Sequence, residues 1–277
     1  MTLKQIINSA YKDRFAVGGF NFFNYESALA IATGAKEAKK PTILMVSEKS
    51  VNYYGLDNLA FAFEKVKKLT GAEIFLHLDH GRDLSLIRQC IKSGFDSVMF
   101  DGSKLPIDQN IELSKDLRRE AHRKDVFFEA EIGHVGGKED FVSSSVFKTN
   151  PAEALIFFDK VAPDILAVAI GNIHGEKTSQ EQLDFSLLAK IQDTIKAPLV
   201  LHGCSGRSDR EYQVAISGGV VKINIDTELR HAFVEGFKKA IHQKESDPRE
   251  ILSISSVQIT KNVRQRIQLF AGGCCHR

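Results

Sequence analysis

The chain has few cysteines and lacks the segments that carry a protein into or across a membrane. Its four cysteines include no C-x-x-C pair, which argues against a zinc ribbon, and Cys274 and Cys275 are adjacent and poorly placed to bridge each other. This count indicates a reducing compartment rather than a disulfide framework. There is no run of about 18 apolar residues, and the first twenty residues contain scattered charges instead of an apolar signal-peptide core. We therefore expect a cytoplasmic protein with no membrane partner.

The chain also lacks a strong excess of charge. Its 37 Lys and Arg residues nearly balance 35 Asp and Glu residues, for a net charge of +2 over 277 residues. This balance argues against a protein built to bind nucleic acid or an anionic surface, but it permits a local basic pocket for a small phosphate ester. No linker, low-complexity tract or shift in composition marks a second domain, so we expect one domain over residues 1–277.

Apolar runs that favour β-strands alternate with amphipathic stretches along the whole chain. Continuous apolar runs are typical of strands buried on both faces of a parallel sheet. The runs are Ala16–Phe20, Pro41–Val46, Glu73–Leu78, Ser97–Phe100, Val126–Ala130, Ile165–Ile170, Pro198–Leu201 and Val220–Ile225. Eight βα repeats in a chain of this length predict an α/β fold, a single-domain (β/α)8 TIM barrel. The alternative is an open doubly wound sheet, whose dinucleotide-binding form is weakened because no G-x-G-x-x-G follows the first strand.

The intervals between these runs have the apolar spacing of helices. The predicted helices are Tyr25–Lys39, Leu84–Ser93, Asn110–Arg123, Ala152–Val161, Leu187–Ile195 and Arg210–Ser217.

Three histidines, His80, His174 and His202, follow predicted strands and are each next to a glycine. The carboxyl ends of the strands of a parallel barrel meet on one face, where the active site forms. Three imidazoles with an open fourth position describe a catalytic zinc site. The alternative for any one histidine is a hydrogen-bonded structural residue, but three at equivalent positions favour a metal site.

Carboxylates stand beside these histidines. Asp79 directly precedes His80, and we expect it to act as a general acid or base, with the alternative that it orients a metal ligand. Asp101 and Glu131, at the ends of the fourth and fifth strands, are candidates to hold a second cation or to orient His80. Each of the two alone would more often be a satisfied carboxylate at the end of a strand.

Two glycine-rich or helix-opening turns indicate an anion site. After the seventh strand, Gly203, Cys204 and Ser205 offer backbone N–H groups and a hydroxyl. After the eighth, Asn224, Ile225, Asp226 and Thr227 open a helix whose first amides are available. Many barrels bind phosphate at these two loops. One such turn alone would be a simple tight turn, whereas two on adjacent strands favour phosphate binding.

The segment His134–Asn150 has no clear periodicity, and its glycines and serines suggest a mobile lid. Glu139 lies on this segment. Its alternatives are a solvated surface carboxylate and a base that reaches the substrate only when the lid excludes water.

Across nearly the whole chain, from GGFNFFN to RQRIQLF, the sequence resembles the class II, zinc-dependent ketose-bisphosphate aldolases. The stretches that carry the resemblance are HLDHG, GFDSVMFDGSKLP, EAEIG followed by GGKED, AVAIGNIHG, PLVLHGCSG and KINIDTELR. Together they are far more specific than any one of them.

The resemblance implies a role for each of the residues that match. It implies that His80, His174 and His202 bind the zinc ion and that Asp79 exchanges the proton of the hydroxyl at the scissile carbon–carbon bond. Glu139 matches the mobile-loop carboxylate that takes a proton from dihydroxyacetone phosphate. Asp101 and Glu131 match positions that bind a second or alternative metal. The residues implied to contact dihydroxyacetone phosphate are Gly175, Gly203, Cys204, Ser205, Asn224, Ile225, Asp226 and Thr227.

The resemblance further implies a homodimer or homotetramer, and a second divalent or a monovalent cation in some members. It implies reversible cleavage of a ketose 1,6-bisphosphate to dihydroxyacetone phosphate and glyceraldehyde 3-phosphate. Asp226 favours fructose over tagatose 1,6-bisphosphate, because tagatose members tend to have a small residue there. Cys204 departs from the usual glycine. Another ketose phosphate, a metal-dependent hydrolase and a non-catalytic barrel are the remaining alternatives.

Overall fold

Eight parallel strands close into a barrel in the computed structural model, which describes residues 1–139, 142–144, 147–175 and 182–272, excluding the side chains of 137–139 and 142–144. The strands, in their order around the barrel, are β1 (Val17–Asn21), β11 (Val220–Ile225), β10 (Leu199–Leu201), β8 (Ile165–Val168), β5 (Phe127–Ile132), β4 (Ser97–Phe100), β3 (Ile74–Gly81) and β2 (Thr42–Ser47). The (β/α)8 prediction is confirmed.

Strand β1 closes the ring because it pairs with both β2 and β11 in parallel register. Gly19 lies opposite Ile43 on one side and opposite Asn224 on the other. The open doubly wound alternative is therefore wrong, since such a sheet leaves two unpaired edges. All eight strands fall on the predicted apolar runs, with ends that differ by at most three residues.

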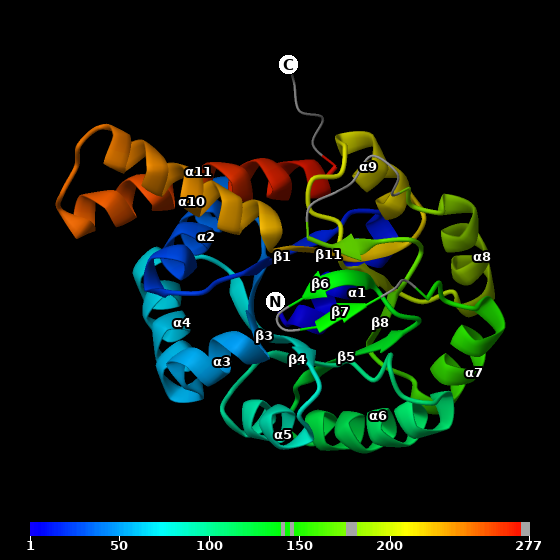
Figure 1. The fold of residues 1–277 in the computed structure, drawn as a ribbon. Coiled ribbons are helices and arrows are strands. Elements are labelled where there is room, and N and C mark those ends of the chain that lie inside the picture. The colour runs from blue at the N-terminus through cyan, green and yellow to red at the C-terminus, as the bar shows by residue number, and fades with distance from the viewer. Residues whose placement is uncertain (140–141, 145–146, 176–181, 273–277) are drawn as a thin grey trace.

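Helices surround the barrel, as Figure 1 shows. The six predicted helices are present as α2 (Tyr25–Ala38), α5 (Leu84–Lys92), α6 (Ile107–His122), α7 (Pro151–Val161), α8 (Phe185–Ile195) and α9 (Asp209–Ser217). Four others were not predicted: α1 (Leu3–Asp13), α3 (Glu48–Tyr54), α4 (Leu56–Thr70) and α11 (Pro248–Phe270). For α10 (Thr227–His242), the start was predicted but not the end. Among the described residues, no helix is long and apolar enough to cross a membrane.

Helix α1 lies across the end of the barrel where the strands begin. A capping box between Thr2 and Gln5 starts the helix. Its apolar face, which includes Leu3, Ile6 and Ile7, packs into a cluster of inward-facing strand residues. This face shields from water the end of the barrel where the strands begin. The opposite end, where the strands finish, is therefore the one that can form a ligand-binding site.

A small second sheet forms from three segments that follow barrel strands. It consists of β6 (Gly136–Glu139), β7 (Val142–Ser144) and β9 (Ile173–His174), in the order β7-β6-β9. Strands β6 and β7 belong to the segment predicted as an irregular lid. They were missed because two strands of three or four residues, rich in glycine and serine, have too little apolar periodicity to detect.

Side chains that point into the barrel form layers, because alternate residues of a strand face the same side. On β3 the inward series is Phe75, His77 and Asp79, and on β5 it is Phe127, Glu129 and Glu131. Phe75 and Phe127 belong to the apolar cluster with α1. The barrel interior is therefore apolar at the bottom and ionisable at the top.

Candidate active site

Asp79 and His80 are consecutive, yet both take part in the same cluster at the end of β3. Successive strand residues normally point to opposite sides. Here the pairing of β3 with β4 shifts between Leu78 and Gly81, and His80 adopts a left-handed backbone with φ of 47°. Such a conformation costs a non-glycine residue about 1–2 kcal/mol. The irregularity turns both side chains toward the barrel axis.

The three predicted histidines converge. The ring centroids of His80 and His202 are 4.4 Å apart, those of His80 and His174 are 5.0 Å apart, and those of His174 and His202 are 6.5 Å apart. His202 directly follows β10, as predicted. His174 does not directly follow a barrel strand, because it lies on β9 of the small sheet, six residues beyond the end of β8. The pairing of β9 with β6 holds it over the barrel mouth.

The donor atoms in this cluster suit a zinc ion. One potential ligand atom from each of Asp79, His80 and His202 lies within 4.8 Å of the other two, and all three residues are buried. Imidazole nitrogen and carboxylate oxygen are donors that Zn²⁺ takes. Burial, followed by the charge of neighbouring histidines, lowers the pKa of His174 and His202 well below the usual value. Both rings are therefore neutral at pH 7, the form that binds a metal.

Two asparagines hold the carboxylate of Asp79. Asn21 donates from Nδ2 to Oδ2 at 3.0 Å, and Asn224 donates from Nδ2 to Oδ1 at 2.9 Å. Burial raises the pKa of Asp79, but the charges of His80, His202 and Lys222 and the bond from Asn21 outweigh burial and lower it. Asp79 is consequently a fixed carboxylate at neutral pH, placed among the histidines.

Asp101 and Glu131 lie behind His80. Its Nδ1 is 3.6 Å from Asp101 Oδ2 and 3.5 Å from Glu131 Oε2, and these three residues form a second group with metal-binding donors. Arg82, which the sequence analysis did not single out, ion-pairs with Asp101. Ser103 donates to the other oxygen of Asp101 at 2.6 Å and links it to His134. The two carboxylates thus orient His80 in this structure, and the guanidinium of Arg82 already lies beside Asp101.

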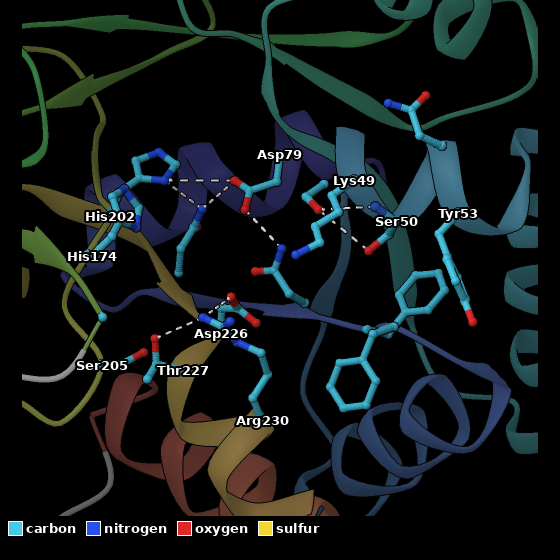
Figure 2. A pocket seen from close by; sticks show the side chains of 18 of the residues that line it. Lys49, Ser50, Tyr53, Asp79, His174, His202, Ser205, Asp226, Thr227 and Arg230 are labelled. Carbon is cyan, nitrogen blue, oxygen red and sulfur yellow. Dashed lines mark hydrogen bonds and ion pairs between the residues drawn. The ribbon is translucent and has the colours of Figure 1, made fainter. Parts of the chain in front are cut away.

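A cavity of about 540 Å³ opens beside the histidines. Figure 2 shows His174 and His202 at one side, Ser50 and Tyr53 at the other, and Asp79 and Lys49 between them. Of the predicted site residues, those that line it are Asp79, His174, Gly175, His202, Gly203, Ser205, Asn224, Asp226 and Thr227. His80, Asp101 and Glu131 are buried behind this wall. The cavity is large enough for a small phosphorylated sugar.

Both predicted phosphate turns reach the cavity, and one requires glycine. Gly203 has φ of 54°, and a Cβ there would lie 2.8 Å from the carbonyl carbon of Ile173 and 3.0 Å from His174 N. No side chain fits at that distance, so glycine lets the turn after β10 pack against β9. Thr227 begins α10, a helix of 16 residues, and it lines the cavity near Ser205 (Figure 2), so the end of the helix that favours an anion lies at this wall.

Two predicted substrate contacts lie elsewhere. The side chains of Cys204 and Ile225 have no exposed surface, and neither residue lines the cavity. Cys204 Sγ donates toward the carbonyl oxygens of Leu201 and Asn224, and burial raises the pKa of the thiol. Cys204 therefore packs under the phosphate turn as an unreactive residue. Only the backbone of these positions is left for substrate contact.

Glu139, the predicted lid base, is the last residue of β6, where its backbone pairs with Val142. Its side chain lies outside the described residues. The backbone position is on the same sheet as His174, since β6 pairs with both β7 and β9. The predicted base and the third histidine thus belong to one structural unit.

Several lining residues were missed by the sequence analysis. Lys49, Ser50, Asn52, Tyr53 and Tyr54 lie on α3, and Arg230 lies on α10, where it pairs with Asp226 at 3.0 Å. The sequence signal was weak because α3 has only seven residues. Helix α3 begins at Glu48, directly after the last residue of β2, so the missed residues follow the carboxyl end of a barrel strand.

A family model described as fructose-bisphosphate aldolase class-II matches residues 1–273. Among solved structures, the YdjI aldolase from Escherichia coli K12 is similar with a TM-score of 0.86 and 29% identity, over 98% of this chain and 97% of that chain. A fructose-bisphosphate aldolase from Campylobacter jejuni is similar in fold with a TM-score of 0.83 and 22% identity, over 97% of this chain and 93% of that chain.

Proposed function

Because the chain belongs to the class II fructose-bisphosphate aldolase family, a family of carbon–carbon lyases, we propose that it cleaves fructose 1,6-bisphosphate reversibly to dihydroxyacetone phosphate and glyceraldehyde 3-phosphate. The observation that carries the proposal is the convergence of His80, His174 and His202 with Asp79 beside one cavity. Cleavage of a ketose needs an electron sink at its carbonyl. A zinc ion held by the three histidines supplies that sink as a Lewis acid when it is bound.

Asp79 takes the proton from the hydroxyl at the scissile bond during cleavage and returns it during synthesis. Its lowered pKa keeps it as a carboxylate at pH 7, and the hydrogen bonds from Asn21 and Asn224 fix its orientation. Both asparagines also line the cavity. The base therefore waits in position before the substrate arrives, which reduces the reorganisation needed for proton transfer.

The turns after β10 and β11 bind the phosphate of the three-carbon half. Ser205 offers a hydroxyl, Gly175 has open space beside its backbone, and Thr227 begins a helix whose amides favour an anion. Gly203 lets this turn pack closely against β9. Anchoring this phosphate holds the ketone next to the histidines. Glu139 on β6 exchanges the proton of dihydroxyacetone phosphate when the small sheet covers the site.

A lysine Schiff base is the alternative electron sink for an aldolase. Lys222 lies inside the barrel, but it is 2% exposed, does not line the cavity and pairs with Glu129 at 2.8 Å. Lys49 is the lysine among the described lining residues, and it lies apart from His174 and His202 (Figure 2). Neither lysine supports a Schiff base at the reacting carbonyl.

Tagatose 1,6-bisphosphate remains the second candidate substrate, followed by other ketose phosphates. Asp226 favours fructose, and its ion pair with Arg230 places a cation beside it at the cavity wall. We further propose a single domain over residues 1–277 and a homodimer or homotetramer, which light scattering of the purified protein tests.

The deciding experiment measures triose phosphate release from fructose and tagatose 1,6-bisphosphates by the protein as purified, after chelation, and after zinc is restored. We expect activity that chelation abolishes and zinc recovers, with a higher kcat/KM for the fructose isomer. Activity that survives complete removal of bound metal would exclude the proposed mechanism. A higher kcat/KM for tagatose would reverse the assignment of substrate but keep the reaction class.

A further inference from the structure

A second polar layer lies inside the barrel, one residue pair below the candidate active site. It contains His77 of β3, Ser97 of β4, Glu129 of β5 and Lys222 of β11, each at most 2% exposed. None of them lines the cavity. Strands β3 and β11 are not neighbours in the barrel, and neither are β5 and β11, so contacts among these side chains cross the interior. The proposed reaction does not use this layer.

The four side chains and His202 form one continuous chain of contacts. Lys222 Nζ is 2.8 Å from Glu129 Oε2 and 3.4 Å from His77 Nε2. His77 Nδ1 is 2.8 Å from Ser97 Oγ. At the other end, Glu129 Oε1 is 2.8 Å from His202 Nε2. The ammonium of Lys222 therefore reaches a candidate metal ligand through a single carboxylate.

The positions of the protons in this series of hydrogen bonds follow from Lys222, which can only donate, and Glu129, which can only accept. An ammonium only donates and a carboxylate only accepts. Lys222 thus donates to both Glu129 and His77, which leaves His77 to donate from Nδ1 to Ser97. Since Glu129 accepts on its second oxygen as well, the proton of His202 must be on Nε2.

Asn224 requires the same tautomer from the opposite side of the ring. Its Nδ2 is 2.9 Å from His202 Nδ1 and 2.9 Å from Asp79 Oδ1, so the amide donates and Nδ1 accepts. A neutral imidazole has only one nitrogen with a free lone pair. In His202 that nitrogen is Nδ1, which faces Asp79 at 3.8 Å on the side of the other donor atoms.

Burial of an ion pair is costly unless its geometry and further hydrogen bonds compensate. Apolar residues fill the layer beneath, where Phe75, Phe127 and Val200 belong to the cluster with α1. The same strands could thus have continued with apolar side chains. We propose that Lys222 and Glu129 are positioning residues that hold His202 as its Nε2–H tautomer, so that the Nδ1 lone pair, which accepts from Asn224 in this structure, is the one that a metal would take in place of that hydrogen bond.

This inference rests on the proposed function to the extent that His202 must bind the metal. Carboxylates that orient a metal-bound histidine commonly change metal affinity 10- to 100-fold when they are replaced. A purely structural ion pair would instead change the stability of the fold and leave the zinc affinity of folded protein unchanged. The two roles are separable by experiment.

The variants are Glu129→Gln, Lys222→Met and the double variant, with Lys238→Met as a matched control. Glu129→Gln keeps the shape of the side chain, but its amide can donate to His202 Nε2 as well as accept from it. Lys222→Met leaves Glu129 without its cation and can prevent folding, whereas the double variant removes both charges of this buried ion pair. Lys238 pairs with Glu235 on α10, where both side chains are 67% exposed.

Zinc affinity is measured by competition with a chelator, and the thermal stability of the metal-free protein is measured in parallel. We expect Glu129→Gln to bind zinc about 10- to 100-fold more weakly. The double variant should fold and show the same loss of zinc affinity, because Lys222 acts on His202 only through Glu129, whose Oε1 contacts the ring. Lys238→Met should match the original protein. Zinc affinity within twofold of the original in both Glu129→Gln and the double variant overturns the proposal.

The tautomer itself is read from ¹⁵N chemical shifts of the metal-free protein labelled at histidine. The original protein should carry the His202 proton on Nε2, and Glu129→Gln should show a smaller fraction of that tautomer, because only the bond from Asn224 to Nδ1 then still favours it. A proton on Nδ1 in the original protein overturns the proposal. Both readouts are independent of catalysis, so absence of aldol cleavage with either bisphosphate refutes the proposed function while these measurements still test the role of Glu129.

Discussion

Arg82 donates through both Nε and Nη2 to one carboxylate oxygen of Asp101, at 2.7 and 2.5 Å. The same oxygen lies 3.6 Å from His80 Nδ1. Burial raises the pKa of Asp101, but bonds and charge from His80, Arg82 and Ser103 outweigh it and hold the pKa well below its usual value. A guanidinium therefore supplies positive charge at the position where the sequence suggested a second metal ion.

We predict that replacing Arg82 makes a second metal site accessible. In Arg82→Ala, Asp101 and Glu131 lose the neighbouring cation while His80 keeps both of its carboxylate contacts. Metal content after equilibration with excess zinc or manganese should rise from one to two ions per chain. The matched control is Arg88→Ala, which removes a surface pair with Glu120. Two ions in the original protein, or one in Arg82→Ala, would contradict this prediction.

The second prediction concerns Asp79. Replacement by alanine should lower kcat by a factor of about 10²–10⁴, the usual contribution of a general acid or base. Bound zinc should remain, since the three histidines are unchanged. Asp83→Ala is the control: it removes an exposed helix N-cap and should cost about 1 kcal/mol of stability without affecting kcat. Unaltered turnover in Asp79→Ala would remove its assigned role.

Stability of the metal-free protein should fall as the pH drops below about 6.5, the pKa of an unperturbed histidine. Burial, and then the charge of Lys222, lowers the pKa of His77 well below that value, and burial does the same for His174 and His202. Between the folded and unfolded pKa values the unfolded chain binds more protons, so acid favours unfolding and the full stability is present above pH 6.5.

Thermal melts between pH 7.5 and 5.5 check this third prediction through a falling Tm. His77→Gln can keep the hydrogen bonds to Lys222 and Ser97 without a ring that titrates, so its Tm should fall less steeply. A Tm that stays constant or rises toward pH 5.5 would show that these rings do not behave as buried neutral groups.

The fourth prediction tests the base on β6. Glu139→Ala should slow the exchange of solvent deuterium into dihydroxyacetone phosphate, measured by NMR, while zinc content stays the same. A carboxylate that acts as the general base contributes about 10²–10⁴-fold. Glu153→Ala, an exposed position on α7, serves as the control. Normal exchange in Glu139→Ala would leave the segment without its proposed chemical role.

Two glycines of one turn provide the fifth prediction. Gly206→Ala has open space for its Cβ and is strained only by its φ of 76°, so it should lose about 1–2 kcal/mol of stability. Gly203→Ala also collides with the backbone of Ile173 and His174. It should therefore raise KM and weaken zinc binding as well. Equal effects of the two substitutions on KM and zinc affinity would argue against close packing of this turn on β9.

The sequence contained the barrel because its signals are local. Continuous apolar runs predict strands buried on both faces, and all eight occur where expected. Asp79 and His202 were found as candidates because the carboxyl ends of parallel barrel strands lie on one face. A polar residue at the end of an apolar run is therefore expected on that face. The family motifs added the roles.

Only the tertiary structure determined which strands of the small sheet pair and which side chains of the site contact each other. The pairing of β9 with β6, the guanidinium of Arg82 on Asp101, and the path from Lys222 through Glu129 to His202 each join residues that are distant in sequence or unpatterned. Apolar periodicity tells which face of a strand is inward, but not how far neighbouring strands are staggered. In a closed barrel that stagger is fixed by the register of all eight strands together, and it determines which inward side chains share a layer.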